Sequence, residues 1–213
     1  MKNSAFLEEL VNRYPQLGSV EDEIQKAAEC MVTCYQQGGK VLVCGNGGSC
    51  SDSDHIVGEL MKGFENRRPV ADYLKNKLSD FGGERGAWLA EKLQQGLPAI
   101  SLTSHTALIS AVSNDIDSDV VYAQQVTGYG NEGDVLIAIS TSGNAQNVID
   151  AIITAKAKGM AVIGLTGETG GRMKPLCDIL INVPGKRTSF IQELHLPVYH
   201  TLCLMVENSL FGS

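Results

Sequence analysis

The stretch "KVLVCGNGGSCSDSDHIVGEL", residues 40–60, decides the fold. Its first part is a short apolar run of the kind that forms a buried strand, and its last part has the composition of a helix. The glycines of "GNGGS" between them allow a tight turn and a close approach of the backbone to a ligand. A strand, a glycine-rich turn and a helix in this order form the repeating unit of a parallel α/β sheet, and such helix N-termini attract anions.

This loop is neither of the two common nucleotide-binding loops. It lacks the Lys-Ser/Thr ending of the P-loop, and Cys50 stands where the dinucleotide fingerprint needs a glycine or alanine. Two interpretations therefore stay open for the glycines: a binding loop for another anion, or only a tight connection between strand and helix.

Short apolar runs alternate with longer segments of helical period along the rest of the chain. Further strands are predicted over residues 97–102, 134–140, 161–166 and 178–183, and helices over 19–39, 144–160 and 189–211. This alternation predicts an α/β fold with a doubly wound, mainly parallel sheet flanked by helices. Ser19, which has an acidic residue three positions after it, is the predicted N-cap of the first of these helices.

The length of 213 residues fits a single domain, residues 1–213, with N-terminal helices over 1–38 and a helical insertion over 65–97. The insertion is rich in charged residues and is interrupted at Gly82 and Gly83, so we expect two short helices there. It shows no pattern that indicates chemistry of its own. It could be a cover over the functional site or a contact between subunits.

Composition excludes several classes of partner. The formal net charge of −7 provides no basic face for nucleic acid, and no cluster of Lys and Arg indicates binding to anionic lipid. The first residues lack the apolar segment of a signal peptide, and no window has the apolar length of a membrane span. The six cysteines form no C-x-x-C pair, which favours reduced thiols. We expect a cytoplasmic protein that binds neither nucleic acid nor membrane.

A second loop strengthens the case for an anion. "STSGN", residues 140–144, follows a predicted strand and precedes a predicted helix, and it offers the hydroxyls of Ser140, Thr141 and Ser142. Hydroxyls and free backbone amides at a helix N-terminus bind phosphate, and loops at the carboxyl ends of parallel strands meet at one edge of the sheet. Helix capping alone would need only one such side chain. We therefore predict a phosphate site.

His55 and Glu59 are four residues apart, which puts them on one face of a helix as a metal site, an acid/base pair or an ordinary surface pair. The predicted C-terminal helix is apolar except for a polar group in "IQELHLPVYH". Its Gln192, His195 and His200 could complete a zinc site, because zinc accepts nitrogen and oxygen ligands. Spacing alone does not choose between the two histidines.

These motifs together resemble the sugar isomerase (SIS) domain family, and within it most closely the phosphoheptose isomerase group. The motifs are "CGNGGS", the His55 and Glu59 pair, "ND" at 114–115, "STSGN", and "IQELH" followed by His200. The resemblance implies a doubly wound fold and a homotetramer with sites between subunits. It also implies interconversion of sedoheptulose 7-phosphate and D-glycero-D-manno-heptose 7-phosphate, for the biosynthesis of cell-surface glycans.

The resemblance assigns a role to each motif. It implies one zinc ion per subunit, with ligands matching His55, Glu59, Gln192 and His200. It implies a phosphate loop and a set of sugar contacts, matching Ser140, Thr141, Ser142, Asn46, Gly47, Gly48, Ser49, Asn114 and Asp115, with Glu59 and Gln192 also facing the substrate. The chain departs from the family pattern at Ala145 and Ser189, and it lacks an arginine after the metal-binding helix, where Lys62 or Arg187 could substitute.

The mechanistic hypothesis is an enediol isomerisation, with Glu59 as the base, His200 as its acid/base partner and zinc polarising the carbonyl. Two other functions stay open. One is a non-catalytic SIS tetramer that binds a sugar phosphate or a protein, as the replication-initiator-associating relatives do. The other is isomerisation of another phosphosugar, since the sequence indicates a phosphosugar more directly than a heptose.

Overall fold

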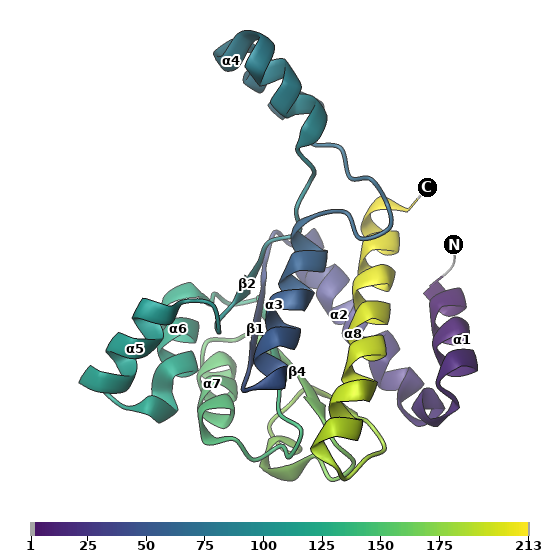
Figure 1. Ribbon diagram of the computed structural model, residues 1–213, viewed down its shortest axis with the longest axis vertical. Coiled ribbons are helices and arrows are strands. Elements are labelled where there is room, and N and C mark those ends of the chain that lie inside the picture. The colour runs from purple at the N-terminus through teal and green to yellow at the C-terminus, as the bar shows by residue number, and fades with distance from the viewer. Residues whose placement is uncertain (1–2, 213) are drawn as a thin grey trace.

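The computed structural model describes residues 3–212 and has a five-stranded parallel sheet at its centre (Figure 1). Its strands are β1 (Val41–Gly45), β2 (Ala99–Ser101), β3 (Val135–Ile139), β4 (Ala161–Thr166) and β5 (Ile179–Asn182). Their order in the sheet is β2-β1-β3-β4-β5, and every neighbouring pair is parallel. The α/β fold with a parallel sheet flanked by helices is therefore confirmed.

Helices cover both faces of the sheet, because successive side chains of each strand point to opposite faces. Val41 and Val43 of β1 belong to one apolar cluster, and Leu42 and Cys44 belong to the other. The first cluster is closed by α1 (Asn3–Arg13), α2 (Glu21–Gln36), α3 (Gly48–Met61) and α8 (Thr188–Phe211). The second is closed by α5 (Thr106–Asp115), α6 (Val121–Tyr129) and α7 (Gln146–Ala157).

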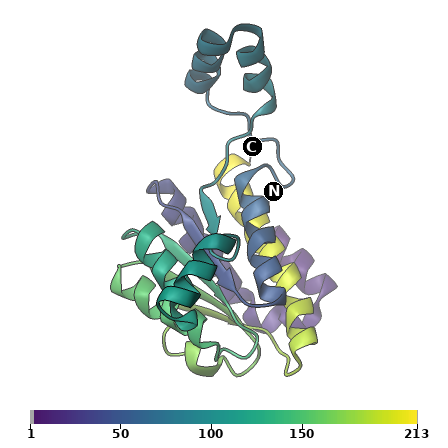
Figure 2. The same ribbon diagram turned by 60° about the vertical axis from the view of Figure 1, so that its left-hand side comes forward.

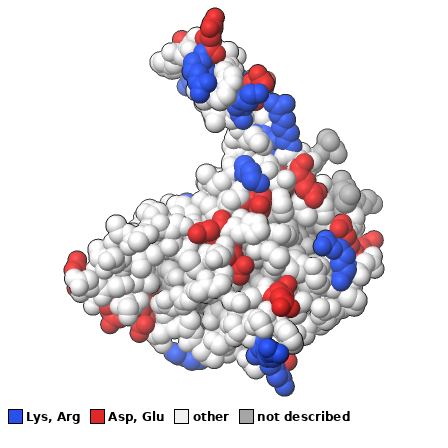
Figure 3. All heavy atoms as spheres, in the orientation of Figure 1, with Lys and Arg blue, Asp and Glu red and all other residues white. Residues whose placement is uncertain are grey.

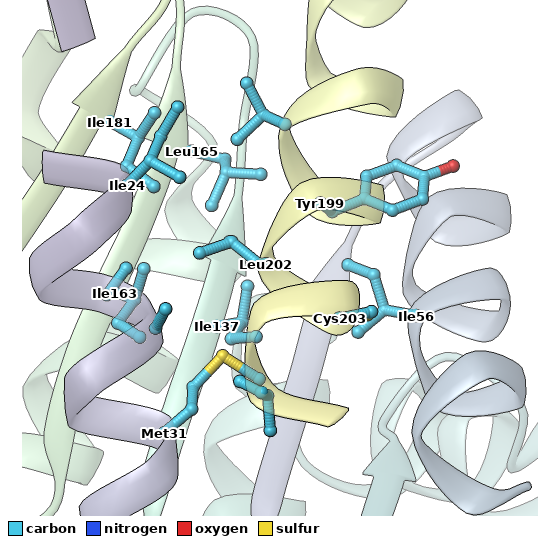
Figure 4. Packing of buried hydrophobic residues seen from close by; sticks show 14 of the residues in the cluster. Ile24, Met31, Ile56, Ile137, Ile163, Leu165, Ile181, Tyr199, Leu202 and Cys203 are labelled. Carbon is cyan, nitrogen blue, oxygen red and sulfur yellow. The ribbon is translucent and has the colours of Figure 1, made fainter. Parts of the chain in front are cut away.

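The first cluster fixes α8 beside α3 (Figure 4). Leu202 and Cys203 of α8 lie between the sheet residues, such as Ile137, and Ile56 of α3. All four side chains are almost fully buried. Burial of an aliphatic side chain of this size contributes about 1.5–3 kcal/mol, so the position of α8 against α3 is strongly determined. Within residues 3–212, no helix has both the length and the apolar character that crossing a membrane requires.

The predicted N-cap at Ser19 is wrong. Ser19 lies inside a 3-10 helix, η1 (Pro15–Val20), which continues directly into α2 at Glu21. The Ser19 hydroxyl donates to the carbonyl oxygen of Gln16 at 3.3 Å and does not cap α2. Because the chain is already helical before α2, there is no open N-terminus at this point for a side chain to cap.

The segment expected to hold two short helices contains α4 (Asp72–Lys92), whose helical backbone is broken at Gly83 (φ 51°). Its two arms project away from the sheet and its helices (Figure 2). Gly86 is needed where the arms meet, because a Cβ there would overlap the carbonyl oxygen of Leu78. At the base, Pro69 and Gln94 form an isolated antiparallel bridge. We call residues 72–92 the α4 hairpin.

Two further 3-10 helices, η2 (Ser118–Val120) and η3 (Gly171–Met173), lie in connections on the second face of the sheet. Like the α4 hairpin, they add no strand to the sheet, so the carboxyl edge of β1 and β3 stays open for the loops that follow these strands.

Candidate functional site

The two loops singled out in the sequence meet in one groove. β1 and β3 are neighbours in the sheet, so the loop after Gly45 and the loop after Ile139 emerge side by side. Most of the residues predicted to bind the sugar phosphate line this groove, which comprises Asn46, Gly47, Gly48, Ser49, Ile139, Ser140, Thr141, Ser142, Ala145, Thr188 and Gln192. The structure thereby brings together residues from three distant parts of the chain.

Three helices begin at or beside this groove. α3 begins at Gly48, α7 begins one residue after Ala145, and α8 begins at Thr188. The N-terminus of a helix carries free backbone N–H groups and the positive end of the helix dipole. An anion in this groove would therefore be attracted although the chain as a whole is negatively charged.

Glycine is required at two points of the first loop. Gly47 has a φ of 58°, a conformation that favours glycine, at the position just before α3. Gly48 lies against α8 so closely that a Cβ would overlap the side-chain amide of Gln192. Gly47 therefore supplies the turn conformation and Gly48 the close approach, the two uses of glycine that the sequence pattern predicted.

The hydroxyls of the second loop differ in exposure. Ser140 is buried, Thr141 is half-buried and Ser142 is exposed. The Ser142 hydroxyl accepts a hydrogen bond from the backbone N–H of Asn144 at 3.2 Å. Ala145 precedes α7 and makes no side-chain cap, so the first N–H groups of that helix have no side-chain partner there. The Ser142 hydroxyl therefore stabilises the turn of the loop. The uncapped N-terminus of α7 lies beside the groove.

Two residues at or beside the groove, Thr188 and Tyr122, were not singled out in the sequence. Thr188 brings a further hydroxyl at the first residue of α8. Tyr122, on α6, donates to the carbonyl oxygen of Gly45 at 2.7 Å and holds the side chain of Asn46 at 3.1 Å. The signal for Thr188 was a hydroxyl at a predicted helix start, whereas nothing local pointed to Tyr122, which is 76 residues from Asn46.

A second polar group lies further along α3 and α8, which pack side by side. It comprises Asp52, His55, Glu59, Tyr199 and His200, and we call it the α3–α8 seam. His55 Nε2 is 3.4 Å from Glu59 Oε1, and the rings of His55 and His200 meet edge to face with centroids 4.9 Å apart. The structure thus places His200 against the predicted His55 and Glu59 pair.

The surroundings keep His200 neutral. Burial lowers its pKa, and the neighbouring His55 lowers it further, against the opposite effect of Glu59. Its Nε2 is buried and has no hydrogen-bond partner within residues 3–212. Phe64 packs on the other side of the ring at 5.4 Å. A neutral imidazole with a free ring nitrogen can bind a metal or exchange a proton.

Lys62 lies at the exposed edge of this group. Its Nζ is 2.6 Å from Glu59 Oε2, so it brings a positive charge to the edge of the seam. Arg187, the other candidate, stacks on Phe190 at the start of α8.

The donor set of the seam fits zinc in kind. Two imidazoles and a carboxylate are ordinary zinc ligands. The unpartnered Nε2 of His200 is the atom to which a metal would bind. Among the described residues, no three His, Cys, Asp or Glu side chains lie close enough together to hold a metal ion. The side chains would therefore have to rotate toward a bound ion.

The remaining predicted residues lie elsewhere. Gln192 packs against Gly48 in the groove and lies eight residues, or about 12 Å of helix, before His200. His195 is fully buried, with Nε2 3.3 Å from the carbonyl oxygen of Thr166. Asn114 and Asp115 are exposed at the end of α5, where they bond to each other and do not line the groove.

A buried ion pair holds one end of the seam. Arg68 and Glu207 are both fully buried, with Arg68 Nε 2.7 Å from Glu207 Oε1. Arg68 also donates to the carbonyl oxygen of Leu60 at 2.8 Å, at the end of α3. Glu207 accepts from the backbone N–H groups of Phe64, Glu65 and Asn66 at 2.8–3.0 Å. The pair therefore ties α3 and the segment after it to α8.

The hydrogen bonds keep this buried carboxylate ionised. Burial alone would raise the pKa of Glu207, but the three backbone N–H groups and Arg68 bring it below its ordinary value. No local pattern indicated this pair, whose members are 139 residues apart in the sequence.

Comparison with known proteins shows the family of the chain. The model of the SIS domain family matches residues 5–76 and 84–167. The chain belongs to the SIS domain family. The phosphoheptose isomerase of Burkholderia pseudomallei (strain 1710b) is 41% identical over 189 residues, which are 89% of this chain and 83% of that protein. The phosphoheptose isomerase of Laribacter hongkongensis is 39% identical over 213 residues, which are 99% and 95% of the two chains.

Solved structures show the same relation. A phosphoheptose isomerase from Francisella tularensis matches this SIS chain with a TM-score of 0.76 and 32% identity, over 96% of both chains. The enzyme from Neisseria gonorrhoeae matches with a TM-score of 0.74, again at 32% identity and 96% coverage. The interruption of the family match, between residues 76 and 84, lies within the α4 hairpin.

Proposed function

We propose that this SIS chain is a phosphoheptose isomerase, which interconverts sedoheptulose 7-phosphate and D-glycero-D-manno-heptose 7-phosphate for cell-surface glycan biosynthesis. One observation carries the proposal. α3 and α8 both begin at the groove that is suited to a phosphate, and together they carry the His and Glu side chains of the seam further along the helices. Near-full-length relatives named phosphoheptose isomerase support it.

The two ends of the site are spaced for a phosphosugar. From Ser49, in the groove, to His55, in the seam, α3 rises by about 9 Å. A phosphate held by the helix N-termini and the hydroxyls of Ser140, Thr141 and Thr188 would direct the sugar chain along α3 and α8. Its carbonyl end would then lie at Glu59 and His200.

The chemistry moves one proton between adjacent carbons. Glu59 takes the proton from the carbon next to the carbonyl and returns it to the neighbouring carbon, through an enediol. His200, which is neutral, takes the proton of the hydroxyl and passes it to the oxygen that develops negative charge. When bound at His55, Glu59 and His200, zinc would polarise the carbonyl and stabilise that charge. Gln192, the fourth expected ligand, packs against Gly48 in the groove and would have to reach the ion from there. Glu59 and His200 both contact His55 where α3 and α8 pack together, which supports these roles.

The quaternary arrangement belongs to the same proposal. A homotetramer with one zinc ion per subunit and sites between subunits would let Asn114 and Asp115, which are exposed on α5, reach the site of another subunit. The chain would act as a single domain over residues 1–213, with the 65–97 insertion, including the α4 hairpin, as a cover or a subunit contact.

The test is a turnover assay on sedoheptulose 7-phosphate with the metal stripped and zinc restored. His200→Ala is compared with His105→Gln, a histidine that packs on Tyr129 outside the seam. Zinc-dependent turnover that is lost only in His200→Ala supports the proposal. Zinc binding without turnover would point to another phosphosugar. A folded protein with neither zinc nor turnover would favour a non-catalytic sugar-phosphate module.

A further inference from the structure

We propose that Tyr199 and Asp52 act as positioning residues that fix the tautomer and ring orientation of His55, so that its Nε2 faces the metal. This inference rests on the proposed function for the identity of the bound group. It adds two residues that the family motifs do not include and that belong to the seam only through the packing of α8 on α3.

The contacts form a short chain. Tyr199 Oη lies 3.2 Å from Asp52 Oδ1, to which it donates. His55 Nδ1 lies 3.0 Å from the same hydroxyl. The other ring nitrogen, Nε2, lies on the Glu59 side, 3.4 Å from Oε1. The two nitrogens of His55 therefore face different partners: Nδ1 faces Tyr199, and Nε2 faces the site.

Counting protons gives the tautomer. An ionised carboxylate can only accept hydrogen bonds, and a phenol has one proton. Because the proton of Tyr199 is directed to Asp52, the Tyr199 oxygen must accept from His55. Nδ1 of a neutral His55 then carries the proton, and Nε2 keeps its lone pair for a ligand. In metalloproteins, the partner of the second ring nitrogen fixes the ligating imidazole in this way.

The packing around Tyr199 holds this chain of contacts in place. The Tyr199 side chain is 1% exposed, and its ring packs edge to face against His55 and against His200, at 5.5 and 5.1 Å. Asp52 is three residues before His55 on α3, so helix geometry places both on one face. Tyr199 therefore contacts both histidines of the seam, one through its hydroxyl and both through its ring.

The first test measures zinc affinity of the metal-stripped protein by competition with a chromogenic chelator. Tyr199→Phe keeps the ring and removes only the hydroxyl, and outer-shell changes of this kind weaken metal binding about 10–100-fold. The matched control is Tyr35→Phe on α2, whose buried hydroxyl has no hydrogen-bond partner within residues 3–212. We expect Tyr35→Phe to bind zinc like the wild type. Equal affinity of Tyr199→Phe and the wild type would overturn the inference.

The second test needs no metal. Nitrogen-15 NMR of the metal-free protein distinguishes imidazole tautomers, and His55→Gln identifies the signal among the four histidines of the chain. The wild type should show His55 protonated at Nδ1, and Tyr199→Phe should lose this preference while Tyr35→Phe keeps it. A wild-type His55 protonated mainly at Nε2 would contradict the inference.

The outcomes separate this inference from the proposed function. A wild type that binds no zinc counts against the metal site, and the tautomer measurement still decides the role of Tyr199. If Tyr199→Phe fails to fold, Asp52→Leu takes its place. Without the carboxylate, the Tyr199 hydroxyl loses its acceptor and is free to donate to His55 Nδ1, so protonation should shift to Nε2 and zinc binding should weaken. An unchanged tautomer in Asp52→Leu would overturn the inference.

Discussion

The α3–α8 seam and the α4 hairpin are both built from paired helices, yet they differ in what holds them. In the seam, polar groups meet across two helices that share the main core, and Arg68 and Glu207 hold one end of it. The hairpin packs closely against none of the other helices and strands described, and its Phe81 is 92% exposed.

Charge follows the same division. Lys, Arg, Asp and Glu are interspersed over the hairpin (Figure 3), and its ion pairs join near neighbours such as Lys75 and Asp72. In the main body, the ion pair that ties α8 to α3 joins Arg68 and Glu207, which are far apart in sequence. Glu59, by contrast, pairs with its helix neighbours His55 and Lys62. A fully buried, hydrogen-bonded pair is costly to break, whereas neighbouring surface pairs contribute little.

The largest effect is expected at the chemical centre of the seam. Glu59→Gln keeps the size of the side chain but removes the proposed base, so turnover of sedoheptulose 7-phosphate should fall about 10²–10⁴-fold with the fold intact. Steady-state kinetics with circular dichroism as the folding control measure this. Near-normal turnover would move the role of base to another residue.

The next effect concerns the end of the seam. Glu207→Ala leaves the Arg68 guanidinium buried without its partner, which should lower the free energy of unfolding by about 3–5 kcal/mol in urea titrations. Replacing both residues by apolar ones should not restore stability, because the backbone N–H groups of residues 64–66 would still lack their acceptor. A stable double variant would show that the single variant is destabilised by the unpaired charge of Arg68, and not by the loss of the three backbone hydrogen bonds.

The free energy of unfolding is expected to depend on pH through His195, which lies in α8. Burial lowers the pKa of His195 to about 4, although the hydrogen bond to Thr166 acts in the opposite direction. Between pH 6.5 and 4 the unfolded chain therefore binds a proton that the folded chain does not, and stability falls as pH falls. At pH 5 the loss is about 2 kcal/mol relative to pH 7.

His195→Gln should lose this component, so the difference between the two proteins, measured by urea unfolding at pH 7 and pH 5, reports it. An equal decline in both proteins would mean that other groups are responsible.

The smallest effect is expected at the hairpin. Removing residues 72–92 and joining the flanking residues by two glycines should change the free energy of unfolding by less than about 1 kcal/mol, because the bridge between Pro69 and Gln94 already brings the ends together. Urea unfolding measures the change. A larger loss would show that the hairpin supports the core. Sedimentation and turnover of the same variant would separate a subunit contact from a cover.

The sequence predicted the local units well. The glycine loop, the order of strands and helices, and the placement of His55 and Glu59 on one helical face all depend on neighbouring residues, whose periodicity the sequence displays. It failed at Ser19, where a preceding 3-10 helix removed the terminus that the side chain was expected to cap. It also left the choice between His195 and His200 to the family resemblance.

What only the tertiary structure decided is which distant groups meet. β1 lies beside β3 although β2 comes between them in the chain, and this places the two loops in one groove. Tyr199 reaches His55 across 144 residues, and Glu207 reaches Arg68 across 139. Such pairings follow from the packing of whole helices on the sheet, which buries apolar surface without regard to separation in sequence. Local periodicity shows which face of a helix is buried, and only the packed core shows what that face meets.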